Sequence, residues 1–160
     1  MRVGFGYDIH PLKKGRRLIL GGQVINHSKG LKGHSDADVV IHALMDALLG
    51  ATGKGDIGLF FPTGEKEYLN ISSLVLLNRV KEILLECKFI ILNIDITIVA
   101  ESPVLKEFYG VMKNNISQVL EIDGSKINIK ATTSEGLGPI GRKKGMEAYA
   151  VCMLKEKTDE

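Results

Sequence analysis

Two histidines and one aspartate are spaced so that their side chains can meet at one point. Residues 2–9, RVGFGYDI, have the alternation of a strand, on which Asp8 and His10 would face the same side. Residues 38–49, DVVIHALMDALL, contain no Lys, Arg or Glu, which is typical of a buried helix, and this helix carries His42. A buried ionisable side chain needs a partner or a metal. Two histidines and a carboxylate leave one position of a zinc site open, as in catalytic sites. The alternative is a core histidine bonded to Asp8, with His10 exposed.

The segment that precedes this helix, GHSDAD at 33–38, is a candidate anion site. Backbone N–H groups at a helix N-terminus favour anions, and His34 and Ser35 add donors. The alternative is an ordinary capping segment, in which Ser35 and Asp36 are the N-cap candidates and Gly50 ends the helix.

A third candidate follows the helix in the loop GDIG at 55–58. Asp46 and Asp56 can each accept a hydroxyl hydrogen bond from a polyol. The alternatives are an ordinary Asp-x-Gly turn for Asp56 and, for Asp46, a hydrogen bond to His10 or His42.

The fourth candidate is ATTSEG at 131–136, which comes directly after a predicted strand. Its three hydroxyl groups can hold phosphate oxygens, and Glu135 can hold a hard cation such as Mg²⁺. The glycine-rich and basic segment 136–145 follows. Neither a Walker A nor a GxGxxG pattern is present, so a standard nucleotide loop is not expected. The alternative is a polar loop with a basic edge.

The elements that position these groups alternate between strands and helices. Ser102-Pro103 is expected to open the third helix. The order predicts an α+β fold with helices on one face of a mixed sheet. It also predicts one domain over 1–155 and a frayed tail at 156–160. The predicted elements are strand 2–9, a hairpin around Gly21-Gly22, helix 38–49, an extended loop to Glu67, helix 73–87, strand 89–100, a third helix, strand 126–132 and strand 146–154.

One face of the predicted sheet is polar and has no helix left to cover it. It is therefore either solvated or a subunit interface. Its side chains alternate along the two strands at 89–100 and 126–132: Asn93, Asp95, Thr97, Lys126, Asn128 and Lys130.

Composition excludes several classes of protein. A formal charge of +2 is too balanced for a protein that binds nucleic acid mainly through charge. No apolar run reaches the ~18 residues of a membrane span, and no signal peptide is evident. Two distant cysteines, Cys87 and Cys152, favour a reduced, cytoplasmic setting.

Eighteen glycines are abundant for 160 residues, and we expect Gly4 and Gly6 to leave room for a metal beside Asp8.

Together these segments resemble the 2-C-methyl-D-erythritol 2,4-cyclodiphosphate synthase family. The matching stretches are GYDIHP at 6–11, GHSDADVVIHALMDALLG at 33–50, GDIG at 55–58, FP at 61–62 and NIKATTSEGLG at 128–138. The resemblance runs from residue 1 to about residue 154. It implies a phosphorus–oxygen lyase that converts 4-diphosphocytidyl-2-C-methyl-D-erythritol 2-phosphate to the cyclic diphosphate. The 2-phosphate attacks the β-phosphorus and CMP leaves, so no protein nucleophile is needed.

The resemblance also assigns roles to residues. It implies that Asp8, His10 and His42 hold Zn²⁺, and that Glu135 helps to place Mg²⁺ or Mn²⁺ on the diphosphate. His34, Thr133 and Glu135 are the implied catalytic residues. The implied substrate contacts are Asp8, His10, His34, Ser35, Asp46, Asp56, Ile57, Gly58, Phe61, Ala100, Pro103, Val104, Leu105, Ala131, Thr132, Thr133, Ser134, Glu135 and Arg142.

The family is a homotrimer, in which the cytidine pocket faces the zinc of the neighbouring subunit. This implies that the polar sheet face is an interface. Val104 replaces a lysine that is common in the family, and Lys144 replaces a glutamate. Lys144 and Arg142 lie near the mouth of a central cavity that binds isoprenoid diphosphate in some members.

Two other functions compete with cyclisation. One is a zinc-dependent phosphohydrolase of a nucleotide-linked substrate, and the other is a non-catalytic trimer that binds isoprenoids or nucleotides. No obvious general base lies beside Asp8 and His10, which favours cyclisation because the substrate supplies its own nucleophile. A binding module would not need two metal sites.

Overall fold

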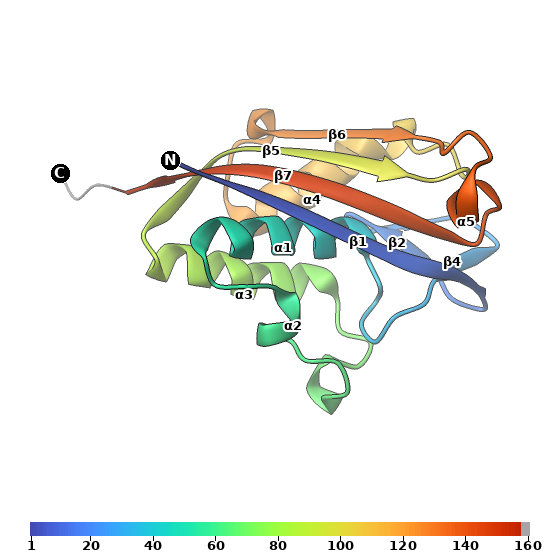
Figure 1. Ribbon diagram of the computed structural model, residues 1–160, viewed down its shortest axis with the longest axis horizontal. Helices are drawn as coiled ribbons and strands as arrows, with labels where there is room; N and C mark the ends of the chain where they lie inside the picture. Colours follow the sequence, from blue (N-terminus) through green and yellow to red (C-terminus); the bar gives the residue numbers. More distant parts are fainter. Residues whose placement is uncertain (158–160) are drawn as a thin grey trace.

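The protein is built on a five-stranded mixed sheet whose helices lie on one side (Figure 1). The computed structural model describes residues 1–157. The strand order is β4-β1-β7-β5-β6, and only the β5–β6 pair is parallel. The predicted α+β fold with a mixed sheet is therefore confirmed. The strands are β1 (Arg2–Lys14), β4 (Lys29–Leu31), β5 (Phe89–Val99), β6 (Ile127–Thr132) and β7 (Gly145–Glu156).

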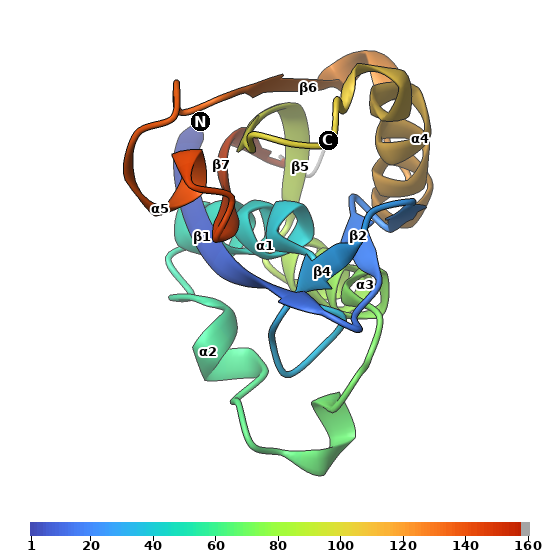
Figure 2. The same cartoon turned by 90° about the vertical axis from the view of Figure 1, so that its right-hand side faces the viewer.

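Three long helices cover the sheet, and shorter helical turns lie in the loops. Figure 2 shows α1 in the middle of the molecule, with β1 and β6 on two sides of it. Nearly all of α1 is buried, as the absence of Lys, Arg and Glu predicts. The helices are α1 (Val39–Thr52), α2 (Ile57–Phe60), α3 (Ser73–Glu86), α4 (Tyr109–Leu120) and α5 (Gly138–Gly141), with 3₁₀ turns η1 (Lys66–Tyr68), η2 (Lys106–Phe108) and η3 (Gly124–Lys126).

The predicted ends of α1 are wrong at both sides. Its N-cap is Asp38 rather than Ser35 or Asp36, because the Asp38 carboxylate accepts hydrogen bonds from the N–H groups of residues 40 and 41. Gly50 does not end the helix, which continues to Thr52. Gly53 ends it, because its left-handed φ of 75° lets its N–H bond back to the last turn.

Gly4 and Gly6 allow α1 to approach β1 closely. A Cβ atom at Gly4 would lie 1.8 Å from the carbonyl oxygen of Ala47, and one at Gly6 would lie 1.9 Å from that of Ala43. Such contacts are far inside van der Waals range. The expectation that these glycines make room for a metal is therefore wrong, since they make room for the helix backbone.

The hairpin at Gly21-Gly22 is confirmed. Strands β2 (Leu18–Leu20) and β3 (Gln23–Ile25) pair antiparallel across these two glycines, whose φ values are 56° and 72°. A two-residue turn with both φ values positive matches the right-handed twist of the paired strands.

Two loop predictions differ from the structure. The segment from residue 50 to 67 is not wholly extended, because the Asp56 side chain caps α2 within it. Ser102-Pro103 does not open the third helix. That peptide bond is cis, and helical structure starts only at η2, after the buried Leu105.

The sheet face opposite the helices is uncovered, as predicted, but half of it is apolar. Asn93, Asp95, Thr97, Asn128 and Lys130 form the expected polar half on β5 and β6. Lys126 lies in η3 instead of the strand. The sequence prediction missed the other half, on β1 and β7, where five apolar side chains are exposed: Val3, Phe5, Tyr7, Ile9 and Val151.

Ordered structure near the C-terminus continues two residues beyond the predicted limit at residue 155. Glu156 pairs with Phe89, and the N–H of Lys157 donates to the carbonyl oxygen of Lys88 at 2.7 Å. Pairing with β5 therefore orders residues 156 and 157, which were expected to fray, and 158–160 lie outside the described residues. Among the helices in residues 1–157, none has the length and apolarity of a membrane span.

Candidate metal centre and adjoining pockets

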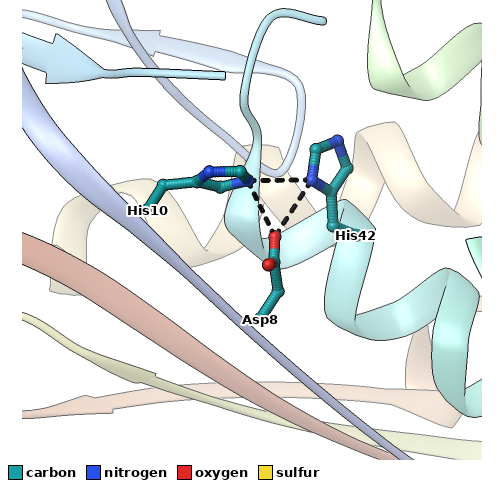
Figure 3. A group of neighbouring side chains, drawn as sticks. All are labelled: Asp8, His10 and His42. Atoms are coloured by element: carbon teal, nitrogen blue, oxygen red, sulfur yellow. Dashed lines mark hydrogen bonds and ion pairs between the residues drawn. The ribbon is translucent and has the colours of Figure 1, made fainter. Parts of the chain in front are cut away.

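Asp8, His10 and His42 point toward one another in the structure (Figure 3). Asp8 and His10 come from β1, and His42 comes from the first turn of α1. The Asp8 Oδ2 atom lies 2.9 Å from His10 Nε2 and 3.0 Å from His42 Nδ1, and the two nitrogens are 3.1 Å apart. The three residues that the sequence analysis joined are thus brought together.

The donor set fits a metal with an open coordination position. Tetrahedral Zn²⁺ with bonds of about 2.0 Å holds its ligand atoms about 3.3 Å apart, close to the distances observed here. Two imidazoles and one carboxylate are ordinary ligands for such an ion. Within residues 1–157, this is the one group of three or more His, Cys, Asp or Glu side chains with that proximity.

The charges within this triad are strongly coupled. Burial opposes ionisation of Asp8, but the hydrogen bonds from His10 and His42 outweigh it and hold the pKa of Asp8 well below its usual range. Burial also lowers the pKa of His42, but the hydrogen bond and charge of Asp8 outweigh it and raise that pKa. The predicted alternative of an exposed His10 is not observed, because its side chain is only 18% exposed and contacts Asp8.

A cavity of about 230 Å³ opens beside the triad. It is lined by five further residues that the sequence analysis put in the site: His34, Ser35, Ile57, Gly58 and Phe61. Thr63 and Tyr68 also line it and were missed, because they lie in a segment with no recognisable motif. His34 is held there by a 2.8 Å hydrogen bond between its Nε2 and the carbonyl oxygen of Glu65.

Asp46 and Asp56 do not line this cavity. Asp46 Oδ1 accepts a hydrogen bond from the N–H of Ile57 at 2.8 Å, and burial raises the pKa of Asp46. Asp56 Oδ1 accepts one from the N–H of Leu59 at 3.1 Å. No hydrogen bond between Asp46 and the triad histidines is formed. The two carboxylates hold α2, which presents Ile57 and Gly58 to the cavity.

A second pocket of about 420 Å³ lies where β5 and β6 end. The expected residues Ala100, Pro103, Val104, Leu105, Ala131, Thr132 and Thr133 all line it. Glu101, which lies between the expected residues Ala100 and Pro103, lines it as well, and so do Lys106 and Tyr109, which were missed. Val104 is 78% exposed at this pocket.

The loop after β6 is tied to the second pocket by Glu101. One carboxylate oxygen of Glu101 accepts hydrogen bonds from the N–H and the hydroxyl of Ser134, at 2.8 and 3.1 Å. The backbone bond from Ser134 holds the pKa of Glu101 below its usual value. Next to it, the Thr133 hydroxyl donates to Glu135 at 2.9 Å. Arg142 is exposed just after α5 and lines neither pocket.

The triad and the second pocket lie on different strands of one chain. Asp8 on β1 pairs with Ala148 on β7, and Ala148 pairs with Ile98 on β5. Ile98 in turn pairs with Ala131 on β6. Neighbouring strands are about 4.8 Å apart, so three steps separate the two regions by about 14 Å.

Behind the triad, Asp38 is a buried carboxylate whose importance the sequence analysis missed. It accepts hydrogen bonds from the N–H groups of Gly21 and Gly22 at 3.0 and 2.7 Å, besides capping α1. Burial raises the pKa of Asp38 to about 6. It therefore joins the β2–β3 turn to the start of the helix that carries His42.

The chain is similar to known proteins over nearly its whole length. The model of the YgbB family matches residues 1–155. A protein from Clostridium botulinum strain Okra, described as 2-C-methyl-D-erythritol 2,4-cyclodiphosphate synthase, is 52% identical over 154 residues, which are 96% of this chain and 99% of that protein. A protein of the same description from Syntrophomonas wolfei is 49% identical over 156 residues, which are 98% of this chain and 99% of that protein.

Solved structures agree with this similarity. The bifunctional IspDF from Campylobacter jejuni superimposes with a TM-score of 0.93 at 44% identity, covering 97% of this chain and 42% of that longer chain. The IspF of Plasmodium falciparum, solved as a CDP complex, gives a TM-score of 0.86 at 37% identity and covers 98% of this chain and 97% of that one.

Proposed function

The chain belongs to the YgbB family, and we propose the residues with which it performs the cyclodiphosphate synthase reaction. That reaction is the metal-dependent cyclisation of 4-diphosphocytidyl-2-C-methyl-D-erythritol 2-phosphate. An oxygen of the 2-phosphate forms a bond to the β-phosphorus, and the bond from the β-phosphorus to the CMP oxygen breaks. CMP leaves with the electron pair, which makes the enzyme a phosphorus–oxygen lyase.

The observation that carries this proposal is the triad of Asp8, His10 and His42 at the wall of the 230 Å³ cavity. We assign Zn²⁺ to it, because two imidazoles and a carboxylate suit that ion and leave a position open for a phosphate oxygen. When bound, the metal supplies positive charge beside the β-phosphate. His34 lines the same cavity, where its Nε2 donates to the carbonyl oxygen of Glu65, and we assign it to the phosphate groups of the substrate. Ser35, Ile57, Gly58 and Phe61 surround the methylerythritol group, and Asp46 and Asp56 act by positioning α2.

The second pocket is assigned to the cytidine part of the substrate. Its wall at Ala100, Pro103, Leu105 and Ala131 offers apolar surface and backbone groups, and the Plasmodium falciparum relative was solved with CDP. Thr132, Thr133 and Ser134 supply hydroxyl groups for phosphate oxygens. Glu135 is assigned to a Mg²⁺ or Mn²⁺ ion on the diphosphate. Val104 offers no charge there, so backbone groups carry that contact.

We assign the active enzyme to a homotrimer with its sites between subunits. The exposed apolar side chains of β1 and β7 support an interface, because monomers rarely leave such a patch uncovered. The separation of about 14 Å between the two regions supports sites completed by a neighbouring chain. Arg142 and Lys144, both exposed, are kept as candidates for binding an isoprenoid diphosphate in a central cavity. Two free cysteines are in keeping with a cytoplasmic location.

Hydrolysis is less well supported than cyclisation. Asp8 is the one carboxylate that lines the cavity within residues 1–157, and it belongs to the triad. An attacking water would therefore lack a separate carboxylate base, whereas the 2-phosphate attacks without one. A non-catalytic trimer that only binds isoprenoids or nucleotides would not explain why three metal-ligating side chains meet beside the cavity.

Substitution of His42 by alanine tests the metal assignment. We expect His42→Ala to lose bound Zn²⁺ and to slow CMP release by more than the 10–100-fold that is typical of changes outside the ligand set. Bound metal is measured by elemental analysis and CMP by chromatography. His27→Ala is the matched control, because His27 lies outside the site and contacts Lys29. Equal CMP release from His42→Ala and the wild type would refute the assignment.

A further inference from the structure

The face of His42 that points away from the triad meets two serine hydroxyls. His42 Nε2 lies 3.0 Å from Ser73 Oγ and 3.1 Å from Ser35 Oγ, while its Nδ1 faces Asp8. Ser73 is fully buried, and it belongs to the first turn of α3, 31 positions away along the chain. The orientation of the imidazole ring is therefore fixed from both sides.

The hydroxyl proton of Ser73 determines which atom donates in the hydrogen bond between Ser73 and His42. Ser73 Oγ lies 2.5 Å from Asp36 Oδ1, and the backbone N–H of Ser73 donates to Asp36 Oδ2 at 2.9 Å. A carboxylate can only accept, so the single hydroxyl proton of Ser73 is committed to Asp36. Ser73 Oγ then presents only lone pairs to His42, and Nε2 must carry a proton to bond to it.

That arrangement favours the neutral ring whose Nδ1 carries no proton, and it opposes the effect of Asp8, whose Oδ2 accepts from Nδ1 in the absence of a metal. An unprotonated nitrogen is what a metal ligand requires, and the hydrogen bond of the other nitrogen selects the tautomer. We propose that Asp36 and Ser73 are positioning residues that hold His42 in the tautomer whose Nδ1 binds the metal. This inference rests on the proposed metal site and extends it to two residues that no metal contacts.

The local structure makes Asp36 and Ser73 available for this task. The N-terminus of α3 is capped by Ser72, whose Oγ accepts from the N–H of Leu74 at 3.3 Å. The cap of α1 is Asp38. Because Ser72 and Asp38 act as the N-caps, the Ser73 hydroxyl is left to bond to Asp36 and His42, while Asp36 also accepts from the backbone N–H of Ser73.

The substitution Asp36→Asn reverses the polarity of the relay without changing its shape. The asparagine oxygen would still accept from the N–H of Ser73, and its NH₂ group would donate to Ser73 Oγ. The Ser73 hydroxyl would then be free to donate to Nε2, which favours the imidazole proton on Nδ1 and weakens metal binding. Ser73→Ala removes the acceptor for Nε2–H altogether. Ser72→Ala is the matched control, since it removes a neighbouring hydroxyl that does not face His42.

The affinity for Zn²⁺ alone, measured by competition with a chelator, gives the first readout. We expect Asp36→Asn and Ser73→Ala to bind Zn²⁺ about 10–100-fold more weakly than the wild type, and Ser72→Ala to bind it equally. Histidine ¹⁵N spectra of the metal-free proteins, at one pH at which His42 is neutral, give the second. They should show a larger fraction of His42 protonated at Nε2 in the wild type than in Asp36→Asn, because the effect of Asp8 on Nδ1 is common to both proteins.

Unchanged Zn²⁺ affinity in both variants, or the same fraction of Nε2-protonated His42 in the wild type and Asp36→Asn, would overturn the inference. If Ser73→Ala does not fold, the wild-type spectrum and Asp36→Asn decide it. Failure of the proposed function is a different result, in which the wild type binds Zn²⁺ with the expected tautomer but forms no cyclic diphosphate.

Discussion

Among the polar residues around the triad, some cap helices and others form the hydrogen bonds that orient His42. Ser72 caps α3 while Ser73 faces His42, and Asp38 caps α1 while Asp36 accepts from Ser73. Ser72 and Asp38 thus support helices, whereas the Ser73 hydroxyl supports the metal ligand, and Asp36 bonds to both the hydroxyl and the N–H of Ser73. Substitutions at the adjacent Ser72 and Ser73 therefore separate stability from metal binding.

The sequence predicts the triad but not the residues that support it. Asp8 and His10 are two apart on a strand, and His42 lies on a helix without Lys, Arg or Glu, so local periodicity was sufficient to join them. The partners of Ser73 and Glu101 lie more than 30 positions away. Asp8 and His42 are just as far apart, but histidines and aspartates are typical metal ligands, whereas a serine at a helix start and a glutamate in a loop are common, and for that reason these contacts were missed.

At the scale of elements, the buried start of α1 depends on Asp38. Four backbone N–H groups from the β2–β3 turn and the first turn of α1 converge on its carboxylate. Loss of this group would leave buried donors unpaired, each of which costs roughly 1–3 kcal/mol. The helix that carries His42 is therefore anchored to the hairpin by one side chain.

The same carboxylate predicts a pH dependence of stability. Burial raises the pKa of Asp38 in the folded protein to about 6, from 3.8 in an unpaired aspartate. The folded state then binds the proton more tightly, so the contribution of Asp38 to stability is largest below pH 3.8 and falls as the pH rises through 6. The difference in pKa corresponds to about 3 kcal/mol.

Urea unfolding of the wild type and Asp38→Asn at fixed protein concentration measures this effect. We expect the free energy of unfolding of the wild type to fall by about 2 kcal/mol relative to Asp38→Asn between pH 4 and pH 6.5, which is most of the full difference. Ionisation of Asp8 also makes the free energy of unfolding depend on pH, but this contribution is common to both proteins and cancels when one is subtracted from the other. A difference that stays constant over this range would contradict the prediction.

The order of strands and helices was predictable, whereas several boundaries were not. Alternation along 89–100 and 126–132 indicated β5 and β6, and the glycine pair indicated the hairpin. The sequence does not show which of Gly50 and Gly53 takes the left-handed conformation that ends α1, nor that α4 starts as late as Tyr109. Gly4 and Gly6 also acquire their role only when α1 lies against β1.

At the scale of the whole molecule, the uncovered sheet face predicts assembly. Phe5 is 62% exposed at the centre of its apolar half. We expect Phe5→Asp to convert the proposed trimer to monomers, because each interface would then bury a carboxylate without a partner. Zn²⁺ binding should persist, since the triad lies within one chain, while turnover is lost.

Sedimentation velocity measures the oligomeric state of this variant. Val75→Asp is the matched control, because Val75 is an exposed apolar residue on α3, away from the open sheet face. It should remain trimeric and active. A monomeric wild type, or a trimeric Phe5→Asp, would refute the assignment of this face as the interface.

The most direct test of the account is the stoichiometry of the products. The wild type is incubated with 4-diphosphocytidyl-2-C-methyl-D-erythritol 2-phosphate, Zn²⁺ and Mg²⁺, and CMP and the cyclic diphosphate are quantified together. We predict that each CMP released is matched by one cyclic diphosphate, because the attacking group is the substrate's own phosphate. Release of CMP together with an open-chain diphosphate or free phosphate would show that water attacks instead, and would contradict the account.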